Sequence, residues 1–232
     1  MPSRYYKRVF IKGYFYHIYN RGANKAKVFL DDEDYQTFID ILAYYLAFPI
    51  GKPLSILKQI ESHPAHHKNK VRNLIKTIEI TSTVRLCVYC LIPNHFHLIL
   101  KQENDPTSEN SITNLMRRLI ITYAMYTKKK YDHSGTLFQG KFKNVLVSSD
   151  SQLQQLSKYI HRNPLEIQGS EPLQNYKYSS YPYFIGEELP PEWLNINDIL
   201  SFFAKPNRYL SYKKFVEEEK SQINNLKGIT LE

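Results

Sequence analysis

Cysteine and glycine are scarce in this sequence of 232 residues. Its two cysteines, Cys87 and Cys90, stand three positions apart without any further cysteine, which fits neither a disulfide scaffold nor a four-ligand zinc site. We expect both thiols to be reduced and buried. Only 8 glycines in a chain that is 42% hydrophobic argue against the collagen-like, low-complexity and disordered classes. The phosphate-binding loop G-x-x-x-x-G-K-[ST] is also missing, so no signal for nucleotide hydrolysis is present.

A long apolar run is missing as well. The most apolar stretch, residues 41–50, is far shorter than the roughly 20 residues that a membrane-spanning helix needs. The first residues, MPSRYYKRVFIK, carry charge but have neither the apolar centre nor the small-residue cleavage site of a secretory signal. The sequence therefore predicts a cytoplasmic protein without a membrane partner.

Acidic residues are in the minority, with 22 Asp and Glu against 31 Lys and Arg, which gives a net charge of +9. The excess is uneven, because residues 1–186 carry +11 and residues 187–232 carry −2. A basic main domain indicates a polyanionic partner, and nucleic acid is favoured over an anionic membrane.

Hydrophobic periodicity predicts the element order β-α-β-β-α-β followed by one more helix, which is the ferredoxin-like order of an α+β antiparallel sheet. The expected strands are residues 14–19, 84–91, 95–100 and 142–147, and the expected helices are residues 31–46, 111–131 and 151–162. We expect residues 1–186 to form this domain, with 47–83 as an insertion. Residues 187–232 are expected to form a small helical appendage.

His95 and His97 flank Phe96 on the predicted strand 95–100. Side chains at i and i+2 of a strand share one face, so both imidazoles can converge on one ion while Phe96 enters the core. The alternative is a pair of hydrogen-bonding histidines on a half-exposed strand. Asn94 is expected to be a turn residue after Pro93, and the alternative is that it orients His95.

Tyr159 and Asn163 lie four residues apart at the end of the predicted helix 151–162, so they share one helix face. A phenol in this position can present a nucleophile beside an amide oxygen that binds a metal. The alternative is a packed tyrosine and a capping asparagine.

Several linked motifs carry a wider resemblance. In chain order they are YHIYNRGANKAKVFLDDEDY, IPNHFHLIL, SGTLFQGKFK and YIHRNP, which lie between residues 14 and 181. Together they resemble the single-tyrosine transposases of the HUH superfamily, most of all the subgroup associated with repetitive extragenic palindromes (REP).

The resemblance implies a DNA-nicking and strand-transfer enzyme, that is, a transposase acting on single-stranded, hairpin-containing DNA. His95, His97 and Asn163 would hold a divalent metal, Mg²⁺ or Mn²⁺, and Tyr159 would be the catalytic nucleophile that forms a 5′-phosphotyrosyl intermediate. Related insertion-sequence transposases commonly have Gln at the position of Asn163, and either amide offers a neutral oxygen.

Five basic residues are our candidates for contacts with DNA phosphates: Arg21, Arg117, Arg118, Lys141 and Lys143. The alternative function is a non-catalytic nucleic-acid-binding module that keeps the ferredoxin-like fold and the basic surface. The sequence leaves open whether the protein is a monomer or a homodimer, and whether the tyrosine serves its own chain or a partner.

Overall fold

We analysed a computed structural model of the chain. The structure describes residues 8–48, 83–107, 111–132, 134–168 and 171–218. The expected insertion, 47–83, therefore lies outside the described residues except for positions 47, 48 and 83.

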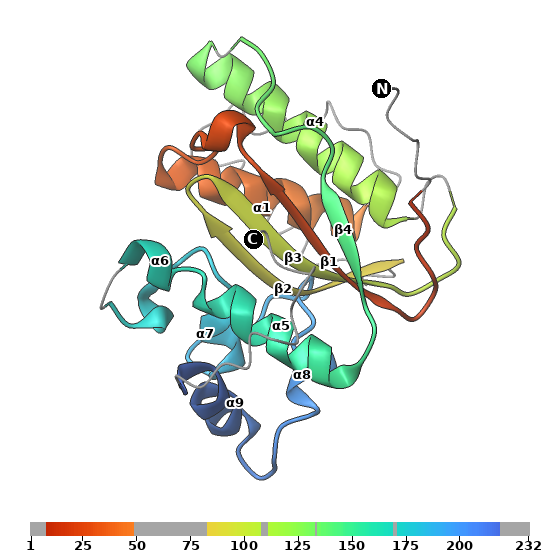
Figure 1. The fold of residues 1–232 in the computed structure, drawn as a ribbon, viewed down its shortest axis with the longest axis vertical. Coiled ribbons are helices and arrows are strands. Elements are labelled where there is room, and N and C mark those ends of the chain that lie inside the picture. The colour runs from red at the N-terminus through yellow and green to blue at the C-terminus, as the bar shows by residue number, and fades with distance from the viewer. Residues whose placement is uncertain (1–7, 49–82, 108–110, 133, 169–170, 219–232) are drawn as a thin grey trace.

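One four-stranded sheet forms the centre of the molecule (Figure 1). Its strands are β1 (Phe15–Arg21), β2 (Val84–Ile92), β3 (His95–Gln102) and β4 (Lys143–Val147). They lie side by side in the order β2-β3-β1-β4, and every neighbouring pair is antiparallel. The α+β class and the ferredoxin-like arrangement predicted from the sequence are thus confirmed.

Two long helices, α1 (Asp32–Ala47) and α4 (Ile112–Tyr131), pack together over one face of this sheet (Figure 1). Each begins at a side chain that accepts a backbone N–H of the first turn, Asp31 for α1 and Ser111 for α4. The layer between helices and sheet is aromatic. Phe38 of α1 lies 5.2 Å from Phe96 of β3 and 5.1 Å from Tyr123 of α4, measured between ring centroids.

The opposite face of the sheet is covered by α5 (Asp150–Arg162), which begins at the capping residue Ser149 and packs against β2, β3 and β4. Leu153, Leu156 and Ile160 form its buried stripe. The sheet thus has helices on both faces, and α5 carries the tyrosine and asparagine singled out in the sequence.

The described chain also contains several short elements. They are the 3₁₀ turns η1 (Ala23–Lys25) and η2 (Leu173–Asn175) and the helices α6 (Leu165–Gln168), α7 (Tyr181–Phe184), α8 (Asn197–Leu200) and α9 (Arg208–Glu217). Of these, η1 follows β1 and the others follow α5.

The segment after α5 holds that helix by buried polar contacts. The two ring nitrogens of His161 lie 2.7 Å from the Tyr212 hydroxyl of α9 and 2.8 Å from the Ser180 hydroxyl. Ser180 in turn accepts the backbone N–H of Tyr89 in β2, and Arg162 donates to the carbonyl of Val216. The boundary that we predicted between residues 186 and 187 stays a prediction.

The structure also bears on the cysteines and on membrane-spanning helices. Cys87 and Cys90 are both free thiols and fully buried in β2, as predicted. Within the described ranges, no helix is long and apolar enough to cross a membrane.

Candidate active site

The alternation of β3 separates the two histidines from the residue between them. Phe96 faces α1 and α4, whereas His97 lies under α5, with its ring centroid 5.7 Å from that of Tyr159. The rings of His95 and His97 are 4.8 Å apart and nearly perpendicular. The prediction that the two histidines share a face away from the core around Phe96 is confirmed.

Each of these histidines has a hydrogen-bond partner at its Nδ1 atom. His95 Nδ1 lies 2.7 Å from Oδ1 of Asn94, and His97 Nδ1 lies 2.9 Å from Nε2 of His17 in β1. Imidazole nitrogens lie on opposite sides of the ring, so a bond at Nδ1 leaves Nε2 as the atom that can ligate a metal. Asn94 thus lies in the turn between β2 and β3, as expected, and it also contacts His95, which was the alternative role.

Asn163 follows the last residue of α5 and is buried. Its Nδ2 donates to the backbone carbonyl of Tyr159 at 2.8 Å. Since only the nitrogen of a carboxamide can donate to a carbonyl, this bond fixes which way the amide lies and leaves Oδ1 as a free acceptor.

Two buried polar atoms at this place, His97 Nε2 and Asn163 Oδ1, have no hydrogen-bond partner among the described residues. Buried polar atoms are almost always paired, so orphans of this kind indicate a missing ligand. An imidazole nitrogen and an amide oxygen fit a divalent cation such as Mg²⁺ or Mn²⁺. The described residues contain no group of three or more His, Cys, Asp and Glu side chains arranged for a metal.

The protonation of the histidines agrees with this chemistry. Burial lowers the pKa of His95, the neighbouring Asn163 side chain opposes this shift, and the charge of Arg21 adds to it, which together bring the pKa to about 4. Burial also lowers the pKa of His97 well below its usual value, with His17 and His95 acting in the same direction. Both imidazoles are therefore neutral at pH 7, which is the form that binds metals.

Tyr159 is half-buried on α5, one turn before Asn163, and its ring stands edge-on to His97 at an interplanar angle of 87°. The predicted pair of a phenol and an amide thus lies against the predicted pair of histidines. These four residues come from β3, from α5 and from the capping residue after α5, and they meet because α5 crosses the face of the sheet on which the histidines lie.

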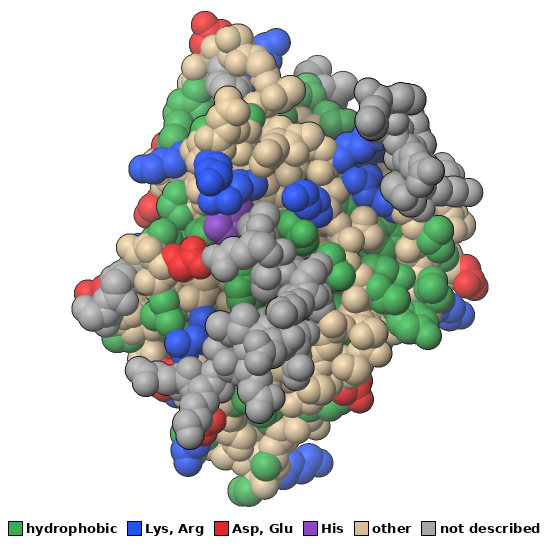
Figure 2. Space-filling model, in the orientation of Figure 1, with side chains coloured by type: hydrophobic (Ala, Val, Ile, Leu, Met, Phe, Trp, Pro, Cys, Tyr) green, Lys and Arg blue, Asp and Glu red, His purple; other side chains and the backbone are tan. Residues whose placement is uncertain are grey.

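Of the five basic residues predicted to contact DNA, two lie on the same face as the histidines. Arg21 is paired with His95 across β1 and β3, and its Nε is buried without a partner among the described residues. Lys143 is paired with Tyr19, and its Nζ lies 5.9 Å from the centre of the Tyr19 ring. In Figure 2, lysine and arginine side chains gather around a histidine on the visible face.

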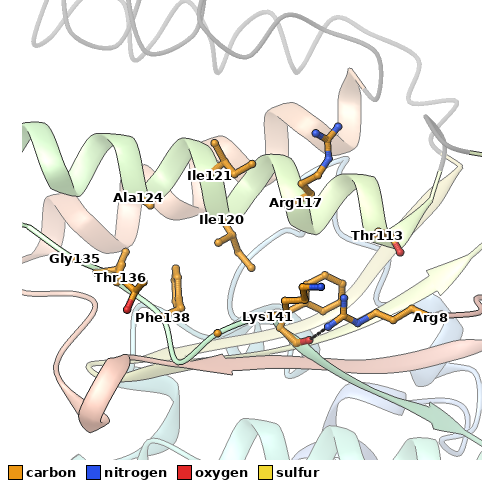
Figure 3. A pocket seen from close by; sticks show the side chains of 13 residues that line it. Arg8, Thr113, Arg117, Ile120, Ile121, Ala124, Gly135, Thr136, Phe138 and Lys141 are labelled. Carbon is orange, nitrogen blue, oxygen red and sulfur yellow. Dashed lines mark hydrogen bonds between the residues drawn. The ribbon is translucent and has the colours of Figure 1, made fainter. Parts of the chain in front are cut away.

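Two other candidates, Arg117 and Lys141, line a cavity of about 640 Å³ between α4 and the loop 135–142 (Figure 3). Its apolar wall includes Ile120, Ile121 and Phe138. The loop also contacts β1 beside the histidines, because Gln139 donates its N–H to the carbonyl of Arg21. The cavity and the histidine site therefore share one loop.

Arg118 does not fit its predicted role, and we correct that expectation. It is buried between α4 and α1, with its guanidinium 4.1 Å from the centre of the Tyr45 ring and 3.3 Å from the carbonyl of Phe48, to which it donates. Arg117 is the residue before Arg118 in α4, and it is exposed because neighbouring helix residues lie about 100° apart around the axis. Arg118 is a packing residue.

The sequence analysis missed His17. A usable signal was present, because His17 and Tyr19 alternate with apolar residues in β1 and so share one face. Only the pairing of β1 with β3 brings that face to His97.

Comparisons with known proteins add an independent line of evidence. Residues 59–163, just under half of the chain, match the family described as "Transposase IS200 like". A protein from Haemophilus influenzae assigned as a REP-associated tyrosine transposase is 30% identical over 110 residues, which is 44% of this chain. The match spans 62% of the length of that relative.

Two solved structures also match. One is a REP-associated tyrosine transposase bound to a REP hairpin, with a TM-score of 0.49 and 13% identity over 80% of this chain and 87% of that one. The other is a protein from Deinococcus radiodurans assigned as a transposase, with a TM-score of 0.34 and 16% identity over 68% of this chain and 95% of that one.

The segment matched by the family contains the histidine pair, Tyr159 and Asn163. The sequence comparisons thus show that this chain is similar to the IS200-like and REP-associated tyrosine transposases.

Proposed function

We propose that the protein is a metal-dependent transposase that nicks single-stranded, hairpin-containing DNA and transfers the strand through a 5′-phosphotyrosyl intermediate. The observation that carries this proposal is the pair of orphaned buried atoms, His97 Nε2 and Asn163 Oδ1, next to the ring of Tyr159. The proposed ligand-binding site and the proposed nucleophile both lie on the segment that matches the transposase family.

The residues that would hold the cation are His95, His97 and Asn163. Neutral imidazoles and one amide oxygen leave coordination positions open for a phosphate, which suits Mg²⁺ or Mn²⁺. When bound, the cation would withdraw charge from the scissile phosphate. Arg21, on the strand beside His95, adds a positive charge that favours a phosphate at the same place.

Tyr159 would carry the covalent step. Its hydroxyl oxygen attacks phosphorus, the bond from phosphorus to the 3′ oxygen breaks, and the DNA 5′ phosphate becomes joined to the phenol. The phenol loses a proton and the leaving 3′ oxygen gains one. Because one phosphodiester replaces another, attack by a new 3′-hydroxyl reverses the step without nucleotide hydrolysis.

The DNA would pass over two groups of cations. Arg21 and Lys143 lie on the face of the sheet that carries the histidines, and Arg117 and Lys141 lie at the cavity beside α4. Lysine and arginine contacts of this kind give affinity for the phosphate backbone without reading sequence. The hairpin substrate rests on the resemblance of the sequence motifs to the single-tyrosine transposases.

The test is a covalent trapping assay with a panel of hairpin oligonucleotides that have single-stranded flanks. Each is labelled at its 3′ end, because a 5′-phosphotyrosyl bond keeps the 3′ fragment on the protein. We expect a protein-DNA band on a denaturing gel with Mn²⁺, none with chelator and none for Tyr159→Phe. Tyr209→Phe, at an exposed tyrosine of α9, is the matched control and should form the band.

Each assignment has its own contrary outcome. A band of full intensity from Tyr159→Phe would show that Tyr159 is not the nucleophile. A band that forms in chelator would show that the reaction needs no metal. Binding of every hairpin without a covalent band would favour the non-catalytic binding module.

A further inference from the structure

His17 lies fully buried in β1 on the same face as His97. Its Nε2 is 2.9 Å from Nδ1 of His97, and the two rings are stacked with centroids 5.1 Å apart. Neither the family resemblance nor the motifs assign this residue a role.

A hydrogen bond between two neutral imidazoles has two possible directions. If His17 donates, then the proton of His97 is on Nε2, and His97 carries a buried N–H that has no acceptor among the described residues. A buried donor and a buried acceptor are both costly when they lack a partner, but a cation can pair only with the acceptor. If His97 donates from Nδ1, its Nε2 carries a lone pair instead, which is the form that a metal needs.

The neighbouring histidine provides a comparison. Nδ2 of Asn94 donates to the carbonyl of Lys25, so the Oδ1 that faces His95 is an acceptor and His95 must donate from Nδ1. His95 is therefore held with its Nε2 lone pair free of a proton. His17 stands in the equivalent position toward His97.

We propose that His17 is a positioning residue that accepts the Nδ1–H of His97 and thereby presents the Nε2 lone pair of His97 to the divalent cation. This inference rests on the metal site of the proposed function. It also assigns the proton of His17 to its own Nδ1, since its Nε2 is the acceptor.

The first test needs no metal. In the full chain labelled with ¹⁵N-histidine, long-range ¹H–¹⁵N correlation spectra report which nitrogen of His97 carries the proton. We expect the Nδ1–H form for wild type and the Nε2–H form for His17→Phe, which keeps a ring but offers no acceptor. A wild-type His97 with its proton on Nε2 would overturn the proposal.

The second test is Mn²⁺ titration of the protein without DNA. We expect His17→Phe to weaken Mn²⁺ binding about 10-fold to 100-fold, the usual effect of losing a partner of a metal-ligating histidine. His17→Gln, whose side-chain oxygen can accept, should retain more of the affinity than His17→Phe. Tyr19→Phe is the control, because it changes a neighbour on the same face without touching the bond.

A role in packing alone gives a different result. Thermal unfolding would then shift for His17→Phe, while the Mn²⁺ affinity of the folded protein would stay at the wild-type value, and that outcome contradicts the proposal. If His17→Phe does not fold, the wild-type spectrum still decides the direction of the bond. Wild-type protein that binds no Mn²⁺ would overturn the proposed metal site. The hydrogen bond from His97 to His17 is tested separately by the spectrum, which reports the protonated nitrogen of His97.

Discussion

The side-chain amide of Asn163 donates to the backbone carbonyl of Tyr159, four residues earlier, at 2.8 Å. This one bond ties the proposed ligand to the turn of α5 that carries the proposed nucleophile. It also leaves the amide oxygen buried and without a partner among the described residues.

Replacement of Asn163 tests the ligand set. We expect Asn163→Ala to weaken Mn²⁺ binding and to raise the Mn²⁺ concentration needed for the covalent band by at least 10-fold, since one of three ligands is lost. Asn163→Gln should recover part of this loss because it restores an amide oxygen. An unchanged Mn²⁺ dependence in Asn163→Ala would show that the oxygen is not a ligand.

The contact of Tyr159 with His97 within one chain predicts a site that is complete in each molecule. The buried bonds of His161 to Tyr212 and Ser180 fix α5 against the same chain. We therefore expect no activity when a Tyr159→Phe chain is co-expressed with a His95→Ala chain. Restored strand transfer in the mixture would mean that the helix is exchanged between two chains.

Arg21 and Arg118 were both expected from the sequence to contact DNA, but the structure predicts that their substitution has different effects. Arg21→Ala should weaken binding of single-stranded DNA and reduce the salt dependence, by a slope of about 0.7 for each lost phosphate contact. Arg118→Ala should leave the salt dependence unchanged and lower the free energy of unfolding, because the packing against Tyr45 is lost. Binding at several salt concentrations and urea unfolding separate the two effects, and equal salt slopes for both variants would contradict the assignment.

Lys130 of α4 forms ion pairs with two aspartates at the start of α1. Its Nζ lies 2.9 Å from Oδ1 of Asp34, a carboxylate with no exposed surface, and 2.7 Å from Oδ2 of Asp31. Hydroxyl groups of Tyr126 and Tyr131 also donate to Asp34. We expect Lys130→Met to lower the free energy of unfolding by about 1–3 kcal/mol, because the buried carboxylate loses its cation but keeps other donors.

The control for this change is Lys128→Met, two residues earlier and exposed. Exposed substitutions usually stay within about 0.5 kcal/mol. Denaturant unfolding compares the two variants, and a similar effect from both would show that these ion pairs contribute no more than an ordinary surface charge.

The two cysteines should be inert in the native protein. Burial raises the pKa of Cys87 and of Cys90 well above the usual value, and the thiolate is the reactive form. A thiol reagent at pH 8 should therefore label neither cysteine in buffer and both in denaturant. Rapid labelling of the folded chain would place a thiol at the surface.

Much of the fold follows from local pattern. Hydrophobic periodicity predicted the strands and the long helices, and in the structure these helices begin at the capping side chains of Asp31, Ser111 and Ser149. Period-two alternation also predicted that His95 and His97 face away from Phe96, because this depends on the backbone geometry of one strand alone.

Contacts between distant segments could not be derived in this way. The outward Arg117 and the buried Arg118 look alike in the sequence, and only the packing of α4 on α1 distinguishes them. Likewise, His17 lies 80 positions from its partner, and only antiparallel pairing of β1 with β3 brings the two rings together.

The sequence by itself determined which residues are the candidates for the chemistry, since His95, His97, Tyr159 and Asn163 stand in short motifs whose spacing sets a shared face. Tertiary structure alone decided how those motifs meet, because the sheet pairs β1 with β3 and packs α5 over them. Orphaned atoms such as His97 Nε2 arise only from that packing, which removes water without supplying a partner among the described residues.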